Sequence, residues 1–212
     1  KGKLRPGATG KDVIITICGF FNKDEVLNHA VEFVGDGVAS LTLNERLTIA
    51  NMTTEWGALA GVFPIDDTTF NWLEERIVFI EKRGLAGVPS DADGQGGHPR
   101  MNDRHLEELR KNRPVSDPDA YYARELTLDL ATVTPHVSGP DNVKTMTAVT
   151  EIRKQKVKVN KAYLVSCVNS RREDLEAAAK VVKGKKVAPG VEFYIAAASN
   201  EVQAASEHDG YW

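Results

Sequence analysis

The sequence predicts an α/β fold, built from strand–helix units with parallel or mixed sheets. Short β-rich or alternating runs are repeatedly followed by longer segments with helical spacing. The clearest unit covers residues 162–179, where an apolar run gives way to small and polar residues around Cys167 and then to a segment rich in Glu, Leu and Ala. This order indicates a strand, a tight loop and a helix. Open α/β sheets place their chemistry on such loops, at the carboxyl ends of strands.

The composition is typical of a globular protein, with 212 residues, 42% hydrophobic and 27% charged. A formal charge of −3 gives no electrostatic reason to expect nucleic acid as a partner. No apolar run approaches the roughly 18 residues of a membrane span, so we expect no membrane partner. The two cysteines, Cys18 and Cys167, are far apart and favour a reducing compartment over a disulfide framework. Because the chain begins without methionine and stops abruptly at Trp212, we expect both ends to be cut.

In the first part of the chain, Thr9 or Asp12 could cap a segment that continues to Phe20. Its β-branched run suits a strand as well as a helix, and periodicity leaves that choice open. Residues 43–60 predict a helix with Asn44 as a possible N-cap. The other elements expected here are a strand over 28–34, a short strand over 62–64, and a helix capped by Asp66 or Asp67 that continues through Ile80.

The middle of the chain changes character, because residues 84–97 are rich in Gly and Asp and predict a mobile loop. His98 and His105 could share a helix face only if both lay on one helix, and Pro99 argues against that, so we expect no zinc site. The later elements expected are a charged helix over 101–111, a short helix over 116–122, a strand over 125–130, a proline-broken join over 133–140, a polar connection over 144–159, a second parallel strand over 193–197 and a helix from Asn200.

Two segments carry a resemblance to a known family. The pattern from Ser166 to Ala178, Ser-Cys-x-Asn-Ser-Arg-x-Glu-Asp-Leu-x-Ala-Ala, closely resembles the aconitase superfamily. Residues 48–58, Thr-Ile-Ala-Asn-Met-Thr-Thr-Glu-Trp-Gly-Ala, resemble the Asn-Met-x-x-Glu-x-Gly-Ala segment of the same family. The resemblance favours a helix for the segment that ends at Phe20. Val165 and Val168 depart from the family pattern, which usually has Gly and Thr there.

The resemblance implies a site. Cys167 matches the first of three thiolates that hold a [4Fe-4S] cluster, and Asn51 and Asn169 match residues that support this cofactor. Glu55 matches a catalytic carboxylate that reaches the iron-bound hydroxyl. Asn51 and Glu55 are four residues apart and would share one helix face. Without the resemblance, Cys167 would be read as a structural thiol and Glu55 as an ordinary surface carboxylate.

The match covers nearly the whole chain apart from the insertion at 84–113. It implies an aconitase-like second domain over residues 1–138 and the first part of a third domain over 139–212. A cubane cluster whose fourth iron stays open to substrate needs three thiolates, and the family supplies two of them from a later Cys-x-x-Cys motif that does not occur here. We therefore expect the cluster in the full-length enzyme but not on this chain alone, which would be inactive.

Within the superfamily, Lys3-Leu-Arg-Pro-Gly and Asn169-Ser-Arg-x-Glu-Asp-Leu resemble the branch of homoaconitase and 3-isopropylmalate dehydratase more than citrate aconitase. The Gly-rich insertion and Tyr163-Leu-Val-Ser-Cys look like the fungal homoaconitases. This implies a hydro-lyase of lysine biosynthesis in the mitochondrial matrix, with a small tricarboxylate substrate and the remaining domains of the same enzyme as partners. The alternatives are 3-isopropylmalate dehydratase or aconitase, an aconitase-related RNA-binding regulator, which the negative charge argues against, and a self-contained binding module.

Overall fold

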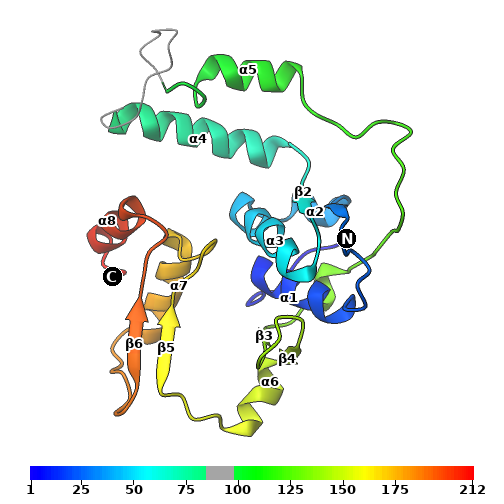
Figure 1. Cartoon of the computed structure of the whole chain (residues 1–212). Coiled ribbons are helices and arrows are strands. Elements are labelled where there is room, and N and C mark those ends of the chain that lie inside the picture. Colours follow the sequence, from blue (N-terminus) through cyan, green and yellow to red (C-terminus); the bar gives the residue numbers. More distant parts are fainter. Residues whose placement is uncertain (85–97) are drawn as a thin grey trace.

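A computed structural model describes residues 1–84 and 98–212. Within these ranges, helices alternate with short strands that form three two-stranded sheets (Figure 1). The pairs β1–β2 and β5–β6 are parallel, and the pair β3–β4 is antiparallel. The predicted α/β class is therefore confirmed, with small parallel and antiparallel sheets.

The first core forms between α1 (Gly10–Phe20) and α3 (Leu43–Trp56). α1 is a helix, which settles the choice that periodicity left open. Thr9 is its N-cap, and the Thr9 N–H donates to Asp12 Oδ2 at 2.8 Å. The apolar residues of α1 pack against α3 and against residues near 130, which gives a core of Val13, Ile14, Ile17, Cys18, Ile49, Met52, Trp56, Leu130 and Val133 together with Val26, Leu41 and Ala58.

The predicted cap of α3 was wrong. Thr42, not Asn44, is the N-cap, because Thr42 Oγ1 accepts from the Glu45 N–H at 3.2 Å and the Glu45 carboxylate accepts from the Thr42 N–H at 2.9 Å. This reciprocal pair is a capping box. The helix ends earlier than predicted, at Gly57, whose φ of 105° is left-handed and suits glycine.

The parallel pair β1 (Ala30–Glu32) and β2 (Ala60–Val62) lies beside α3, and the short helix α2 (Asp36–Ala39) follows β1. β2 begins two residues before the predicted strand. Gly61 allows it to lie directly on α3, because a Cβ at this position would be 2.8 Å from Thr53 Cγ2.

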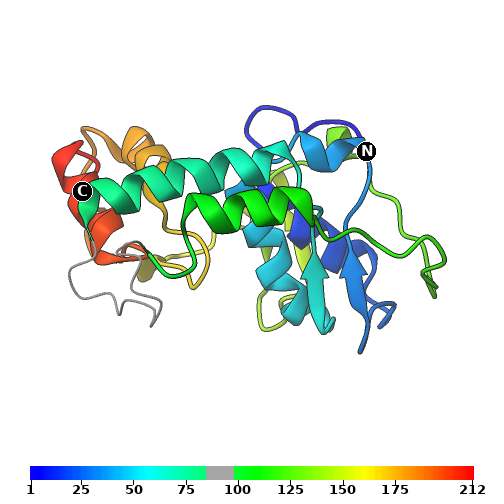
Figure 2. The same cartoon turned by 90° about the horizontal axis from the view of Figure 1, so that it is seen from above.

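α4 (Asp67–Arg83) and α5 (Asp103–Lys111) form a helical hairpin with its own small core of Phe70, Ile77 and Leu106. The predicted cap of α4 is confirmed, since Asp66 accepts from the Thr69 N–H at 3.3 Å. From above, α4 extends across the molecule towards α8 (Asn200–His208) (Figure 2). There Arg76 and Arg83 both pair with Glu201. The predicted loop at 84–97 falls, from residue 85 onward, outside the described residues.

Two predictions for residues 113–130 were wrong. Residues 116–122 form no helix, because their polar side chains bind elsewhere: Ser116 and Tyr122 both donate to the Glu32 carboxylate. Residues 125–129 are extended but pair with no strand, and Leu130–Thr132 form a short 3₁₀ turn, η1. The segment is held instead by the backbone of Lys1: the Lys1 backbone nitrogen donates to the Leu128 carbonyl, and the Leu130 N–H donates to the Lys1 carbonyl, both at 2.8 Å.

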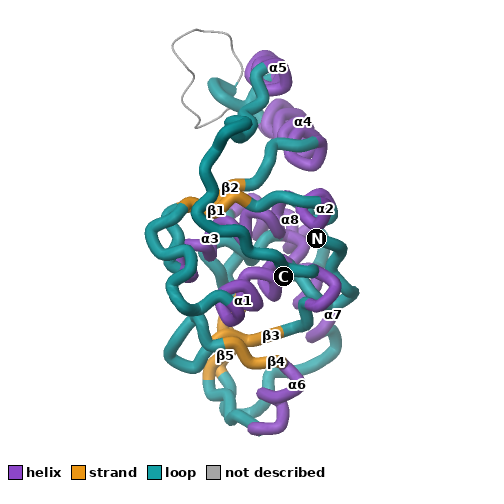
Figure 3. Tube along the Cα trace, turned by 90° about the vertical axis from the view of Figure 1, so that its right-hand side faces the viewer, coloured by secondary structure: helices purple, strands orange, loops and turns teal. Residues whose placement is uncertain are grey.

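The predicted join and polar connection contain a hairpin, β3 (His136–Ser138) and β4 (Met146–Ala148). α6 (Val149–Ile152) and a 3₁₀ turn, η2 (Arg153–Gln155), follow it. The hairpin packs on α1, where a Cβ on Gly19 would be 2.6 Å from Met146 Cβ. The side view in Figure 3 shows it beneath α1. The hairpin straddles residue 138, and the division into domains at that position stays a prediction.

The last unit confirms the strand–loop–helix prediction. β5 (Lys161–Leu164) leads through a loop into α7 (Arg172–Val182), and β6 (Glu192–Ile195) leads into α8. β5 and β6 pair in parallel, with Tyr163 opposite Tyr194. Leu175 of α7 is buried and anchors this helix. The loop after β5 faces α3, and this places it at the candidate site.

Candidate functional site

The loop between β5 and α7 presents Cys167 at its tip. Ser166 Oγ accepts from the N–H groups of Val168 and Asn169 at 3.1 and 2.9 Å, which folds the chain tightly around the cysteine. Ser170 is buried and adopts a left-handed φ of 58°. The Cys167 side chain is therefore exposed on a loop whose backbone is fixed on both sides.

One face of α3 receives this loop. The Cys167 thiol lies 3.8 Å from Asn51 Oδ1, to which it donates a long hydrogen bond. Asn169 Nδ2 donates to Thr48 Oγ1 at 3.0 Å. Three of the four residues predicted from sequence, Cys167, Asn51 and Asn169, thus come together from segments more than 100 residues apart.

Two further residues tie the loop to α3, and sequence reasoning missed both. Arg171 Nε donates to the Val168 carbonyl at 3.0 Å, and Arg171 Nη1 donates to Asn44 Oδ1. The Asn44 amide donates in turn to the Glu173 carboxylate. Arg171 lies inside the motif around Cys167, and that position could have marked it as a site residue. Asn44 carried none, since its pattern indicated only a helix cap.

An open hollow of about 570 Å³ lies between the loop and α3. Its lining combines small and polar residues with the exposed thiol: Leu47, Ala50, Asn51, Thr53, Thr54, Leu59, Ala60, Gly61, Cys167, Val168 and Arg171. The arrangement offers the Cys167 thiol, the Asn51 amide and the Arg171 guanidinium to a ligand placed against α3.

Glu55 lies further along α3, outside the hollow. It is half-buried on α3, one turn beyond Asn51, and it is not among the residues that line the hollow. Its carboxylate acts electrostatically on Cys18 of α1. Burial raises the pKa of the Cys18 thiol to about 11, and the Glu55 carboxylate contributes to the rise, while Lys144 and Lys11 oppose it. The Cys18 thiol therefore stays protonated and is a poor metal ligand.

The described residues offer a ligand for one iron of a cluster, but not the three thiolates that hold a complete one. Within residues 1–84 and 98–212, no group of three or more His, Cys, Asp or Glu side chains could hold a metal ion. Cys167 is exposed, so its sulfur is accessible as a single thiolate ligand. No helix in the same ranges combines the length and apolar character of a membrane span.

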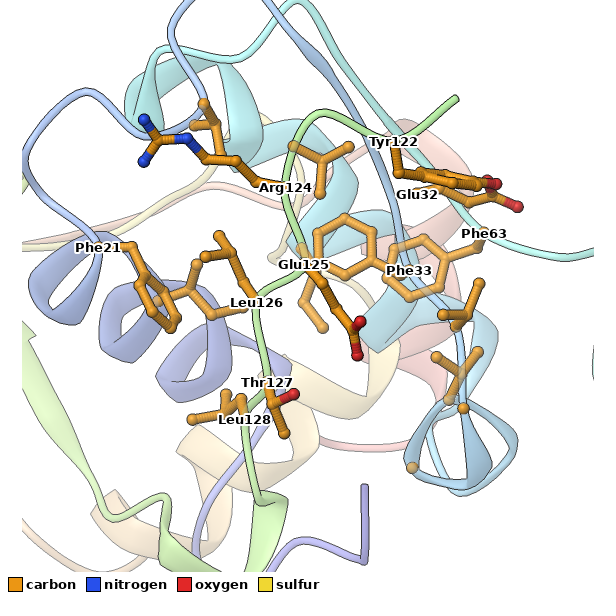
Figure 4. A pocket seen from close by; sticks show the side chains of 18 of the residues that line it. Phe21, Glu32, Phe33, Phe63, Tyr122, Arg124, Glu125, Leu126, Thr127 and Leu128 are labelled. Atoms are coloured by element: carbon orange, nitrogen blue, oxygen red, sulfur yellow. The ribbon is translucent and has the colours of Figure 1, made fainter. Parts of the chain in front are cut away.

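A larger hollow of about 900 Å³ lies on the other side of the first core (Figure 4). Its floor is aromatic, with Phe21, Trp56 and the stacked rings of Phe33 and Phe63, whose centroids are 4.5 Å apart. Residues 121–128 cross over it. None of the four predicted site residues lines this hollow, so it is separate from the candidate site.

The family model described as the aconitase family (aconitate hydratase) matches residues 1–212. Among curated proteins, the chain is 56% identical over 212 residues to "Homoaconitase, mitochondrial" of Mycosarcoma maydis. Proteins of the same name are 55% identical in Cryptococcus neoformans and 51% identical in Debaryomyces hansenii. In each case the whole chain is covered, and it spans about 29% of the relative's length. With the Cys167 loop and the α3 segment both matching the motifs of that family, the chain belongs to the aconitase family.

Proposed function

We propose that this chain is part of a homoaconitase, a hydro-lyase that interconverts homocitrate and homoisocitrate through homoaconitate in lysine biosynthesis. The observation that carries the proposal is the placement of Cys167 against Asn51 on α3, in a chain 51–56% identical to named homoaconitases. Because the chain spans about 29% of those relatives, the activity belongs to a longer protein. Its other domains are the partners of this segment.

The cofactor of the longer protein is a [4Fe-4S] cluster, which when bound supplies an iron that acts as a Lewis acid on the substrate hydroxyl. Cys167 contributes one thiolate ligand, and the other two come from outside this chain. Asn51 and Asn169 orient the cysteine and its surroundings: the Asn51 oxygen lies 3.8 Å from the sulfur, and Asn169 is fixed on Thr48 at 3.0 Å. Polar neighbours of metal ligands set their orientation in this way.

We assign to Glu55 the role of donating a proton to the departing hydroxyl, so that it leaves as water. A carboxylate can accept a proton and return it, and it contributes when it lies within hydrogen-bond reach of the reacting group. Its position one turn from Asn51 on the same helix supports the assignment.

The relatives are named mitochondrial, which supports a mitochondrial location for the longer protein. We propose a small tricarboxylate as its substrate and neither nucleic acid nor a membrane as a partner.

The test uses the full-length protein, purified without oxygen and assayed for hydration of homoaconitate, cis-aconitate and isopropylmaleate. We expect hydration of homoaconitate, with visible absorption and iron counting that show one cluster. Cys167→Ala should lose both cluster and activity, while the matched control Cys18→Ala should keep the cluster, because Cys18 is buried in the α1–α3 core. Preferred turnover of isopropylmaleate or cis-aconitate would assign the protein to another enzyme of the family. A cluster that survives Cys167→Ala would remove Cys167 from the ligand set.

A further inference from the structure

Arg171 joins the Cys167 loop to α3 through two nitrogens of its guanidinium group. We propose that Arg171, with Asn44 as its partner, is a positioning residue that fixes the Cys167 thiol in the orientation in which it binds the cluster. The proposal rests on the proposed function for the identity of the cluster. The positioning of the thiol can be measured with or without that cofactor.

The first step of the argument is the geometry of the guanidinium group. Arg171 Nε donates to the Val168 carbonyl at 3.0 Å, so it closes the loop directly beside Cys167. Nη1 of the same group donates to Asn44 Oδ1 on α3. Because the guanidinium is planar and rigid, these two bonds fix the distance between the loop backbone and the helix.

The second step is that the far end of the loop is also fixed. The Arg171 N–H donates to Asp174 Oδ2 at 3.0 Å, which caps α7. The Asn44 amide donates to Glu173 in the first turn of the same helix. Asn44 therefore accepts a hydrogen bond from Arg171, before α7, and donates one to Glu173, in the first turn of α7. A rotation of α7 against α3 would break one of these bonds.

The third step is the spacing on α3. Asn44, Thr48 and Asn51 are separated by four and three residues and lie on one helix face. Each receives a different loop side chain: Arg171, Asn169 and Cys167 respectively. The contact of Cys167 with Asn51 is the longest of the three and the loop tip is exposed, so the thiol depends on the two other contacts for its position.

The neighbouring arginine provides a matched control. Arg172 Nε donates to Asp209 Oδ2 at 2.7 Å, beyond the end of α8 and away from α3. Arg172→Gln removes the same charge one residue away and also breaks an ion pair, but it leaves the loop bound to α3. Arg171→Lys keeps the positive charge. Its single ammonium group cannot replace the two guanidinium nitrogens that bind the Val168 carbonyl and Asn44.

The experiment measures alkylation of Cys167 by iodoacetamide in the full-length apoprotein, followed on the Cys167 peptide by mass spectrometry across a pH series. The series separates a change in thiolate fraction from a change in access. We expect the limiting rate at high pH to rise about tenfold in Arg171→Gln, equivalent to about 1.4 kcal/mol. Arg171→Lys and Asn44→Ala should behave like Arg171→Gln, and Arg172→Gln should match the wild type. In the cluster-bearing protein, the Arg171 variants should also lose iron to a chelator faster.

Two outcomes would overturn the proposal. A wild-type alkylation rate in Arg171→Gln, with folding confirmed by circular dichroism, would show that the loop holds its thiol without the guanidinium. Full rescue by Arg171→Lys would show that charge and not geometry is the cause. A wild-type protein that binds no cluster would refute the proposed function instead, while the alkylation series on the apoprotein would still decide the role of Arg171.

Discussion

The helix that receives the Cys167 loop is anchored by Arg46, whose side chain is only 1% exposed. Its Nη1 and Nη2 atoms donate to the two oxygens of Asp66 at 2.7 and 2.8 Å, and Nη2 also donates to the Val38 carbonyl at 3.0 Å. We expect Arg46→Met to lower the free energy of unfolding by about 3 kcal/mol, because breaking a buried ion pair leaves a charge uncompensated. The value is at the lower end of the usual range because Asp66 is 30% exposed and water can reach it.

The assay is urea unfolding at neutral pH, followed by tryptophan fluorescence, to which Trp56, buried in the α1–α3 core, contributes. Lys154→Met is the control, because the Lys154–Glu151 pair is on the surface and should contribute less than about 1 kcal/mol. The hydrogen bonds from Arg46 hold the pKa of Asp66 below its usual value. The stabilisation is therefore complete above about pH 4 and is lost as the pH falls through the lowered pKa. A loss below about 1 kcal/mol at neutral pH, or a difference that grows in acid, would refute this reasoning.

Three further changes test other parts of the structure. In the full-length enzyme, Glu55→Gln should lower turnover at least tenfold, where each tenfold loss is about 1.4 kcal/mol, with cluster absorption unchanged; undiminished turnover would remove Glu55 from the mechanism. Alkylation of the apoprotein near neutral pH should label Cys167 well before Cys18, since burial raises the pKa of Cys18 to about 11, and equal early labelling would contradict its burial. Gly10→Ala should destabilise the α1–α3 contact by about 1–3 kcal/mol in urea unfolding, because the new Cβ would lie 2.9 Å from Glu45 Cα, and a neutral result would show that α1 can shift.

Local signals in the sequence predicted the elements that depend on interactions between residues close together in the chain, such as helix caps and turns. Asp66 caps α4 as expected, and the strand, loop and helix around Cys167 appear where the pattern places them. The error at α3 is also local: Thr42-Leu-Asn-Glu45 is a capping box, but the prediction named only Asn44 as the cap.

A strand prediction that needed a distant partner failed. Residues 125–130 alternate as a strand should, but a strand also needs a neighbour, and in the structure this segment crosses a hollow and is held by Lys1. For the same reason the sequence motif indicated Cys167 and Asn169 but not their contacts. Arg171 and Asn44 meet only because α7 and α3 pack together, and they are 127 residues apart.

The two-stranded sheet β5–β6 has a consequence for handling the chain. Within the described residues these strands pair only with each other, so each has an outer edge of free backbone groups, and the stacked Tyr163 and Tyr194 are 60% and 46% exposed. Open edges of this kind are templates for strand addition from another molecule. At high concentration, separated from the rest of a longer protein, copies of this chain should self-associate through this sheet before they unfold. The Lys161–Glu192 ion pair, 3.4 Å long, places charged side chains at the start of both strands, and charged side chains on an edge strand oppose such addition.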